Sequence, residues 1–172
     1  DSPPGEPEEN GLEHVLGVGR VAGHPVGGPV DRLRVGLEEA VDPARIGIYG
    51  GSYGGYLVAL ALGRDSKLFA AGVDIHGVHD WNVAIRHFQP EYNALARPEF
   101  ARRAFDSSPM AFIDGWRSPV LVIHGDDDRN VSFSETVSLV EKLRERQVHV
   151  EQLIFPDEIH GFLLHRNWVK AY

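Results

Sequence analysis

The sequence predicts an α/β protein with a mostly parallel sheet that carries helices on both faces. Short apolar segments near residues 45–49, 69–75 and 120–123 alternate with segments of helical pattern. These short segments are apolar throughout and do not alternate with polar residues. Continuous apolar strands are typical of a parallel sheet that is covered on both sides.

The first 26 residues mix proline, glycine and glutamate, a composition that predicts a poorly ordered segment. Residues 27–172 are predicted to form part of one domain. Apolar residues recur from Val30 to Val41 at steps of three or four, which predicts a helix that Pro43 ends.

Residues 45–49 are predicted to form a buried strand, which leads into Gly50 and Gly51. Small apolar residues over 53–62 predict a buried helix, and residues 69–75 predict the next strand. The mixed, aromatic stretch 80–117 predicts helices and loops.

The second half of the chain repeats the alternation. Residues 120–123 predict a strand, and 134–147 predict an amphipathic helix with Ser134 as its N-cap. A last strand is expected over 148–155, and a final helix is expected over 162–172. We find no apolar run near the roughly 18 residues that a membrane span needs.

The composition excludes several function classes. The formal net charge is −8, which argues against nucleic acid as a partner, because phosphate binding needs clustered lysine and arginine. The chain has no cysteine, so disulfides, thiolate metal sites and a cysteine nucleophile are excluded. The start of the chain lacks a basic segment followed by an apolar one, so we expect a cytoplasmic protein.

The strongest chemical signal is the segment Gly50-Gly51-Ser52-Tyr53-Gly54, which fits the pattern G-x-S-x-G. It lies between a predicted strand and a predicted helix, the context of a nucleophile elbow. Such a tight turn exposes the Ser52 hydroxyl, and the backbone N–H of Tyr53 is placed to stabilise a developing oxyanion. A glycine-rich turn or a phosphate-binding loop is the alternative.

An elbow serine needs an acid and a base later in the chain, in that order. Three adjacent carboxylates, Asp126, Asp127 and Asp128, follow the strand over 120–123, and chemistry alone does not choose between them. A solvated acidic loop is the plain alternative for this cluster. His160 follows the last predicted strand and precedes Gly161, so it is the candidate base.

His76 and His79 follow another predicted strand and are interpreted as lining the site, with metal binding as the weaker alternative. The chain has no H-E-x-x-H pattern, and its aspartates are not spaced as in a calcium loop. We therefore expect neither a metal site nor a cofactor.

Together these segments resemble the catalytic domain of the prolyl oligopeptidase family of serine peptidases. The resemblance rests on residues 45–56, on the His124-Gly125 turn with its aspartates, and on residues 157–162. It implies an α/β-hydrolase fold. It also implies Asp128 as the acid, because the family's aspartate follows the histidine of that turn by four residues. His160 is then the base, and Tyr53 supplies one oxyanion N–H.

The chain also departs from the family pattern. Several strands that normally precede the elbow are missing, and no tyrosine precedes Tyr49 to complete the oxyanion hole. The resemblance implies a peptidase that cleaves oligopeptides through a Ser52–Asp128–His160 triad and an acyl-enzyme. A carboxylesterase and an inactive fragment of a larger peptidase remain the alternatives. The expected partner is a peptide substrate, with no membrane; oligomers are possible.

Overall fold

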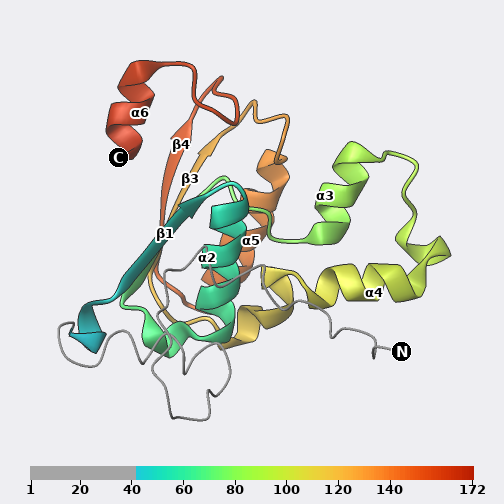
Figure 1. The fold of residues 1–172 in the computed structure, drawn as a ribbon, viewed down its shortest axis with the longest axis horizontal. Coiled ribbons are helices and arrows are strands. Elements are labelled where there is room, and N and C mark those ends of the chain that lie inside the picture. Colours follow the sequence, from blue (N-terminus) through green and yellow to red (C-terminus); the bar gives the residue numbers. More distant parts are fainter. Residues whose placement is uncertain (1–41) are drawn as a thin grey trace, which may run out of the picture. The chain divides into compact units, whose positions relative to one another are not determined.

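A computed structural model describes residues 42–172 (Figure 1). The predicted disorder of residues 1–26 and the helix expected over 30–41 lie outside the described residues. The described chain contains a four-stranded sheet in the order β1-β2-β3-β4, and every neighbouring pair is parallel. The strands are β1 (Gly47–Gly51), β2 (Ala71–Ile75), β3 (Val120–Gly125) and β4 (Val150–Phe155).

Helices connect the strands, as parallel pairing requires. The α-helices are α2 (Tyr53–Arg64), α3 (Trp81–Phe88), α4 (Pro98–Asp106), α5 (Phe133–Glu145) and α6 (His165–Ala171). Short 3₁₀ helices cover Pro43–Arg45, Ser66–Leu68, Ala94–Ala96 and Pro109–Gly115. No helix among the described residues is long and apolar enough to span a membrane.

The larger core lies on the face of the sheet that α2 and α5 cover (Figure 1). Leu62 of α2 and Leu139 of α5 are fully buried against Val122 of β3. Trp116 is also fully buried, and its indole Nε1–H donates to the Ser118 carbonyl at 2.9 Å. This packing fixes α2 and α5 against the same face of the sheet.

The opposite face carries a smaller core of Ile75, Ile123, Phe155 and Phe162. Ala171 of α6 packs against it, so helices cover both faces of the described sheet. The predicted parallel α/β architecture is confirmed.

The strand register brings the carboxyl ends of the strands to one edge. Gly51 pairs with Ile75, Ile75 pairs with Ile123, and Gly125 pairs with Phe155. The segments that follow β1, β2, β3 and β4 therefore meet, although they are far apart in the sequence. This edge is where ligands bind in open α/β sheets.

Several predicted features of the elements are wrong in detail. The first strand spans Gly47–Gly51 rather than 45–49, and it is partly exposed rather than buried. Ser132, rather than Ser134, caps α5, and its hydroxyl accepts the Ser134 N–H at 3.4 Å. The last strand begins at Val150 rather than at residue 148. The Val148 N–H instead donates to the Leu143 carbonyl at 3.0 Å and closes the end of α5.

Candidate active site

Ser52 lies in the turn between β1 and α2 with φ 57° and ψ −118°, a conformation that non-glycine residues rarely adopt. Its N–H donates to the Ile75 carbonyl at 2.9 Å, which anchors the turn to β2. A Cβ on Gly50 would lie 2.6 Å from the Gly54 carbonyl oxygen, so the turn closes only because residue 50 is glycine. The local sequence therefore enforces the strained backbone of a nucleophile elbow.

Tyr53 is the first residue of α2. Its N–H has no carbonyl one turn earlier within the helix, and it lies at the positive end of the helix dipole. The phenol ring is 63% exposed and points away from the core. The backbone of Tyr53, rather than its side chain, is therefore the group placed to stabilise negative charge beside Ser52.

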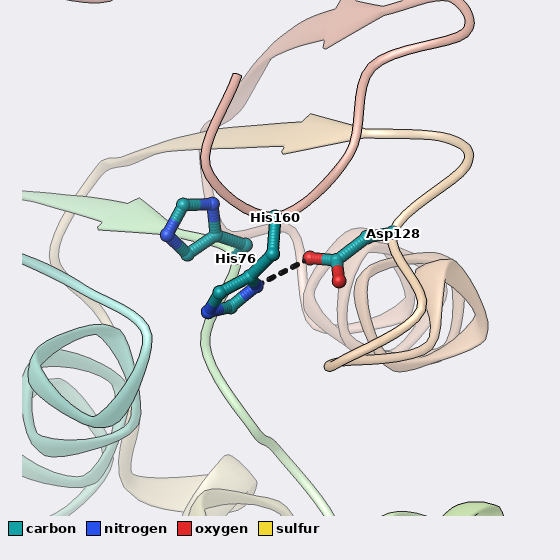
Figure 2. A group of neighbouring side chains, drawn as sticks. All are labelled: His76, Asp128 and His160. Atoms are coloured by element: carbon teal, nitrogen blue, oxygen red, sulfur yellow. Dashed lines mark hydrogen bonds and ion pairs between the residues drawn. The ribbon is translucent and has the colours of Figure 1, made fainter. Parts of the chain in front are cut away.

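His160 lies in the loop after β4 and makes two short contacts. Its Nε2 is 2.8 Å from the Ser52 Oγ. Its Nδ1 is 2.6 Å from the Asp128 Oδ2, the contact that is dashed in Figure 2. Since the Asp128 carboxylate accepts hydrogen bonds, Nδ1 carries the proton, and Nε2 is left to accept the proton of the serine hydroxyl. The structure thus brings Ser52, Asp128 and His160 together in one hydrogen-bonded chain.

The three adjacent aspartates have three different environments. Asp126 accepts the N–H of Asp157 at 2.7 Å and thereby ties the β3 loop to the β4 loop. Asp127 pairs with Arg129 at 3.0 Å in solvent. Asp128 is buried and faces His160. The ambiguity that the sequence left open is therefore resolved by position.

Asp128 is held as a carboxylate. Its Oδ1 accepts the N–H groups of Asn130 at 2.8 Å and Val131 at 3.0 Å. Burial alone raises the pKa of Asp128, but hydrogen bonds from His124, from His160 and from these amides outweigh it. The pKa of Asp128 lies far below its usual value.

His124 is a supporting residue that sequence reasoning did not single out. Its Nε2 lies 3.0 Å from the Asp128 Oδ2 and 3.2 Å from the Val131 carbonyl. Because both neighbours are acceptors, Nε2 carries the proton, and Nδ1 accepts from the Thr136 hydroxyl at 2.7 Å. The signal available in the sequence was a histidine four residues before the acid, at the end of the same strand.

His76 lies beside the catalytic candidates, as Figure 2 shows. Its ring is stacked at a tilt on that of His160, with centroids 4.1 Å apart. The backbone has φ 44°, and the side chain is buried. Burial, followed by the neighbouring His160 and His124, lowers the pKa of His76 to about 4, so the ring is neutral near pH 7.

His79, expected to line the site, is fully buried instead. Its Nε2 is 2.6 Å from the Asp74 Oδ2, and its N–H donates to the Glu135 carboxylate at 3.0 Å. The same Glu135 oxygen accepts the Asp80 N–H at 2.8 Å. These bonds fasten the segment between β2 and α3 to α5. His79 therefore supports this segment from inside the core, and the expectation that it lines the site is wrong.

Tyr53, Tyr56 and Trp81 form a row of aromatic rings with successive centroids 5.3 Å apart, in which Tyr53 is exposed and Tyr56 is buried in the core. His160 lines a cleft of about 580 Å³ together with Asp127, Arg129, Asn130, Ile159 and Gly161. Tyr92 is buried and donates to the Asn82 Oδ1 at 2.7 Å, so its role is structural.

Comparison with known proteins agrees with this geometry. Residues 35–172 match the Prolyl oligopeptidase family. The chain belongs to this family. Its members are serine peptidases, so the resemblance seen in the sequence, the α/β-hydrolase fold and the hydrolase class are confirmed.

Several relatives in the family are dipeptidyl peptidases. The chain is 30% identical over 149 residues to dipeptidyl-peptidase 5 of Porphyromonas endodontalis, covering 78% of this chain and 21% of that protein. It is 31% identical over 123 residues to dipeptidyl peptidase 4 of Bos taurus, covering 70% and 16%. The chain thus spans about a fifth of the length of these relatives.

Solved structures of the family show the same arrangement of elements. The uncomplexed acylaminoacyl peptidase of Pyrococcus horikoshii superposes with a TM-score of 0.65 at 25% identity, covering 77% of this chain and 23% of that one. Dipeptidyl peptidase 4 of Porphyromonas gingivalis gives 0.63 at 27% identity, covering 80% and 20%.

Proposed function

We propose that this chain carries the catalytic centre of a serine peptidase that cleaves oligopeptides, with Ser52 as nucleophile, His160 as base and Asp128 as the orienting acid. The observation that supports the proposal is the continuous hydrogen-bonded chain from the Ser52 Oγ through His160 to Asp128, with distances of 2.8 and 2.6 Å. Nucleophile, base and orienting group within hydrogen-bond reach are the signature of an activated serine.

In the first half-reaction, the Ser52 Oγ attacks the peptide carbonyl carbon while His160 Nε2 takes the hydroxyl proton. The carbonyl oxygen becomes an oxyanion that the Tyr53 N–H stabilises. The imidazolium of His160 gives its proton to the leaving amine, the C–N bond breaks, and an acyl-Ser52 ester remains. Asp128 keeps the His160 ring in the correct tautomer and stabilises its positive charge.

In the second half-reaction, a water molecule replaces the departed amine. His160 Nε2 takes a proton from this water, whose oxygen attacks the ester carbonyl. The tetrahedral intermediate again places its oxyanion beside the Tyr53 N–H. Collapse returns the proton to the Ser52 Oγ and releases the acid product, so the enzyme is regenerated without a net change in protons.

The oxyanion site is the weak part of this centre. Removing one oxyanion donor from a peptidase costs about 2.7–4 kcal/mol of transition-state stabilisation. Tyr53 supplies one donor, and the chain has no tyrosine before Tyr49 to supply the family's second one. We therefore expect this chain, tested by itself, to turn over substrate more slowly than a relative that has both donors.

The relatives support an oligopeptide as substrate. Their names describe a dipeptidyl peptidase and an acylaminoacyl peptidase, both of which act on peptides. The exposed ring of Tyr53, next to Ser52, offers an apolar surface for a substrate side chain. A panel of matched peptide and ester substrates separates a peptidase from a carboxylesterase, because only the peptidase cleaves the amides well.

Labelling of the purified chain with a fluorophosphonate tests the proposal. The probe should label the wild-type chain, and labelling should vanish in Ser52→Ala. Ser138→Ala, which changes an exposed serine on α5, is the matched control and should label normally. Labelling that persists in Ser52→Ala would show that another residue is the nucleophile. A folded wild-type chain that does not label would contradict an assembled centre.

A further inference from the structure

We propose that His76, Asp128 and His160 form a Zn²⁺-binding site at which zinc acts as a reversible inhibitor, not as a cofactor. The inhibition rests on the proposed role of His160 as the base, whereas the binding of the ion does not. Zinc bound here and an active Ser52–His160 pair exclude each other.

The donor set suits zinc. A ring nitrogen of His76, a carboxylate oxygen of Asp128 and a ring nitrogen of His160 all lie within 4.8 Å of one another. Two imidazoles and one carboxylate are a common zinc ligand set, with a solvent molecule as fourth ligand. Bonds near 2.1 Å place tetrahedral ligands about 3.4 Å apart. Closure therefore needs a contraction of at most about 1.4 Å between any two ligand atoms.

His76 supplies the observation that points to a ligand. Its side chain is only 7% exposed, and no group among residues 42–172 forms a hydrogen bond with its Nδ1. Buried polar atoms are nearly always paired, so an unpaired imidazole nitrogen beside two other donors needs an explanation. A bound cation would satisfy it. Figure 2 shows the His76 ring lying directly against the His160 ring.

Two of the three ligands, Asp128 and His76, are held in position by hydrogen bonds to neighbouring groups. Asp128 is fixed by the N–H groups of Asn130 and Val131 and by His124, and none of these bonds has to break when the ion enters. Hydrogen bonds that orient a ligand in this way raise metal affinity. The His76 backbone N–H donates to the Ile123 carbonyl at 2.8 Å, which fixes that residue at the end of β2.

Access to the site comes from the solvent side of His160. Its side chain is 19% exposed and lines the cleft of about 580 Å³ that also contains Asp127. Zinc can therefore reach His160 without opening the core.

Zinc at this site would stop catalysis by occupying the base. Coordination through His160 Nδ1 displaces the ring proton to Nε2, which then cannot accept the Ser52 proton. Coordination through Nε2 uses that lone pair directly. Coordination through Nδ1 replaces the hydrogen bond between Asp128 and His160 with metal bonds, whereas coordination through Nε2 leaves the proton on Nδ1. Neither mode needs a redox step or a net consumption of protons.

The test uses the full chain without a histidine tag. Isothermal titration with ZnCl₂ should show one site, which His76→Asn should weaken roughly tenfold or more. Asparagine is chosen because it tolerates the positive φ at this position. His149→Asn, which changes an exposed histidine, is the matched control and should bind as wild type. Equal affinity in wild type and His76→Asn would overturn the site.

Two further measurements do not depend on the His76 variant. Ser52→Ala should still bind Zn²⁺, which separates failure of this site from failure of the proposed nucleophile. In the wild-type chain, Zn²⁺ should slow fluorophosphonate labelling, and EDTA should restore it. Co²⁺, the spectroscopic stand-in, should give visible d–d absorption of a site with two histidines. Absence of this absorption, or labelling unaffected by saturating Zn²⁺, would contradict the proposal.

Discussion

His124 and His160 bond to the same carboxylate oxygen of Asp128, His124 Nε2 at 3.0 Å and His160 Nδ1 at 2.6 Å. One ring is the candidate base, and the other is fully buried behind the acid. A second donor on that oxygen favours the ionised form of Asp128 and fixes its orientation. The acid of this centre is therefore part of a network that extends to Thr136 on α5.

Removing the His124 donor should weaken the centre. His124→Phe is expected to raise the pKa of Asp128 and to cost about 1.5–3 kcal/mol of stability, the typical value of a hydrogen bond to a charged group. The pH profile of the labelling rate should show its acid limb at higher pH. His124→Gln, which keeps an N–H donor, should recover part of the lost rate. An unchanged profile in His124→Phe would show that this residue only fills space.

Two of the three aspartates after β3 should respond differently to replacement by asparagine. Asp128→Asn should lower the rate of peptide hydrolysis about 10⁴-fold, because an amide no longer holds the correct tautomer of His160. Asp127→Asn, which affects only a solvent-exposed pair with Arg129, should remain within a few-fold of wild type. Steady-state kinetics of the two variants measures the contrast. Equal losses would argue against a special role for Asp128.

The two glycines after Tyr53 should differ in their tolerance of alanine. A Cβ on Gly55 would lie 2.5 Å from the Asp74 Oδ1 and 2.9 Å from the Gly77 Cα, whereas a Cβ on Gly54 would meet nothing within 4 Å. Gly55→Ala should destabilise the fold by about 1–3 kcal/mol. Gly54→Ala should be neutral or gain up to about 1 kcal/mol of helix propensity. Denaturant unfolding compares them, and a reversed order would contradict this packing.

Two leucines on α2 should separate core from surface. Leu62 is fully buried and Leu57 is 48% exposed. Leu62→Ala should cost about 2–5 kcal/mol, because it removes buried methyl groups and leaves a cavity between α2 and the sheet. Leu57→Ala should change stability by less than about 0.5 kcal/mol. Thermal unfolding followed by circular dichroism gives both values. A small effect at residue 62 would mean that α2 does not pack there.

Stability should fall as the pH rises above 6.5. Burial lowers the pKa of His79, but the Asp74 carboxylate and Glu135 outweigh burial and raise it above 6.5. A raised histidine pKa contributes stability that is complete below 6.5 and is lost as the pH rises through the folded value. Burial also raises the pKa of Glu135, which acts in the same direction.

Unfolding in denaturant between pH 6.5 and 9 measures this slope, and His79→Gln should flatten it. His76 acts in the opposite direction and only in the lowest part of this window, because its pKa is about 4 in the folded state and 6.5 in the unfolded state, so its contribution to stability is complete about one unit above 6.5. A slope that is the same in both proteins would assign the pH dependence to other groups.

The sheet was predictable because apolar segments of strand length are visible in the sequence. The run from Val120 to Ile123 is apolar and β-branched, and it forms the buried part of β3. The elbow was equally clear, because a serine flanked by glycines between a predicted strand and a predicted helix is the pattern of a nucleophile elbow. By contrast, the start of α5 is set by local hydrogen bonds that the apolar pattern does not show. Asp128 binds the N–H groups of Asn130 and Val131, and the helix starts directly after Ser132.

The three candidate residues could be chosen from the sequence, whereas the groups around them could not. Ser52 and His160 lie in short motifs, whereas the choice of Asp128 needed the family pattern. His76 and His79 look equivalent in the sequence, since both follow β2 within four residues. Two structural features distinguish them. The positive φ of His76 accompanies a ring that lies at the site, and the bond to the buried Asp74 holds the ring of His79 in the core.

The parallel sheet also has a consequence for the order in which this chain folds. The bond between Ser52 and His160 joins residues 108 positions apart, and no neighbouring strands form a hairpin. Such contacts close late, because long loops lose entropy before any contact repays it. Under the proposed mechanism, Ser52 therefore gains its base only after β4 has left the ribosome and docked beside β3. The last strand thus completes the proposed centre.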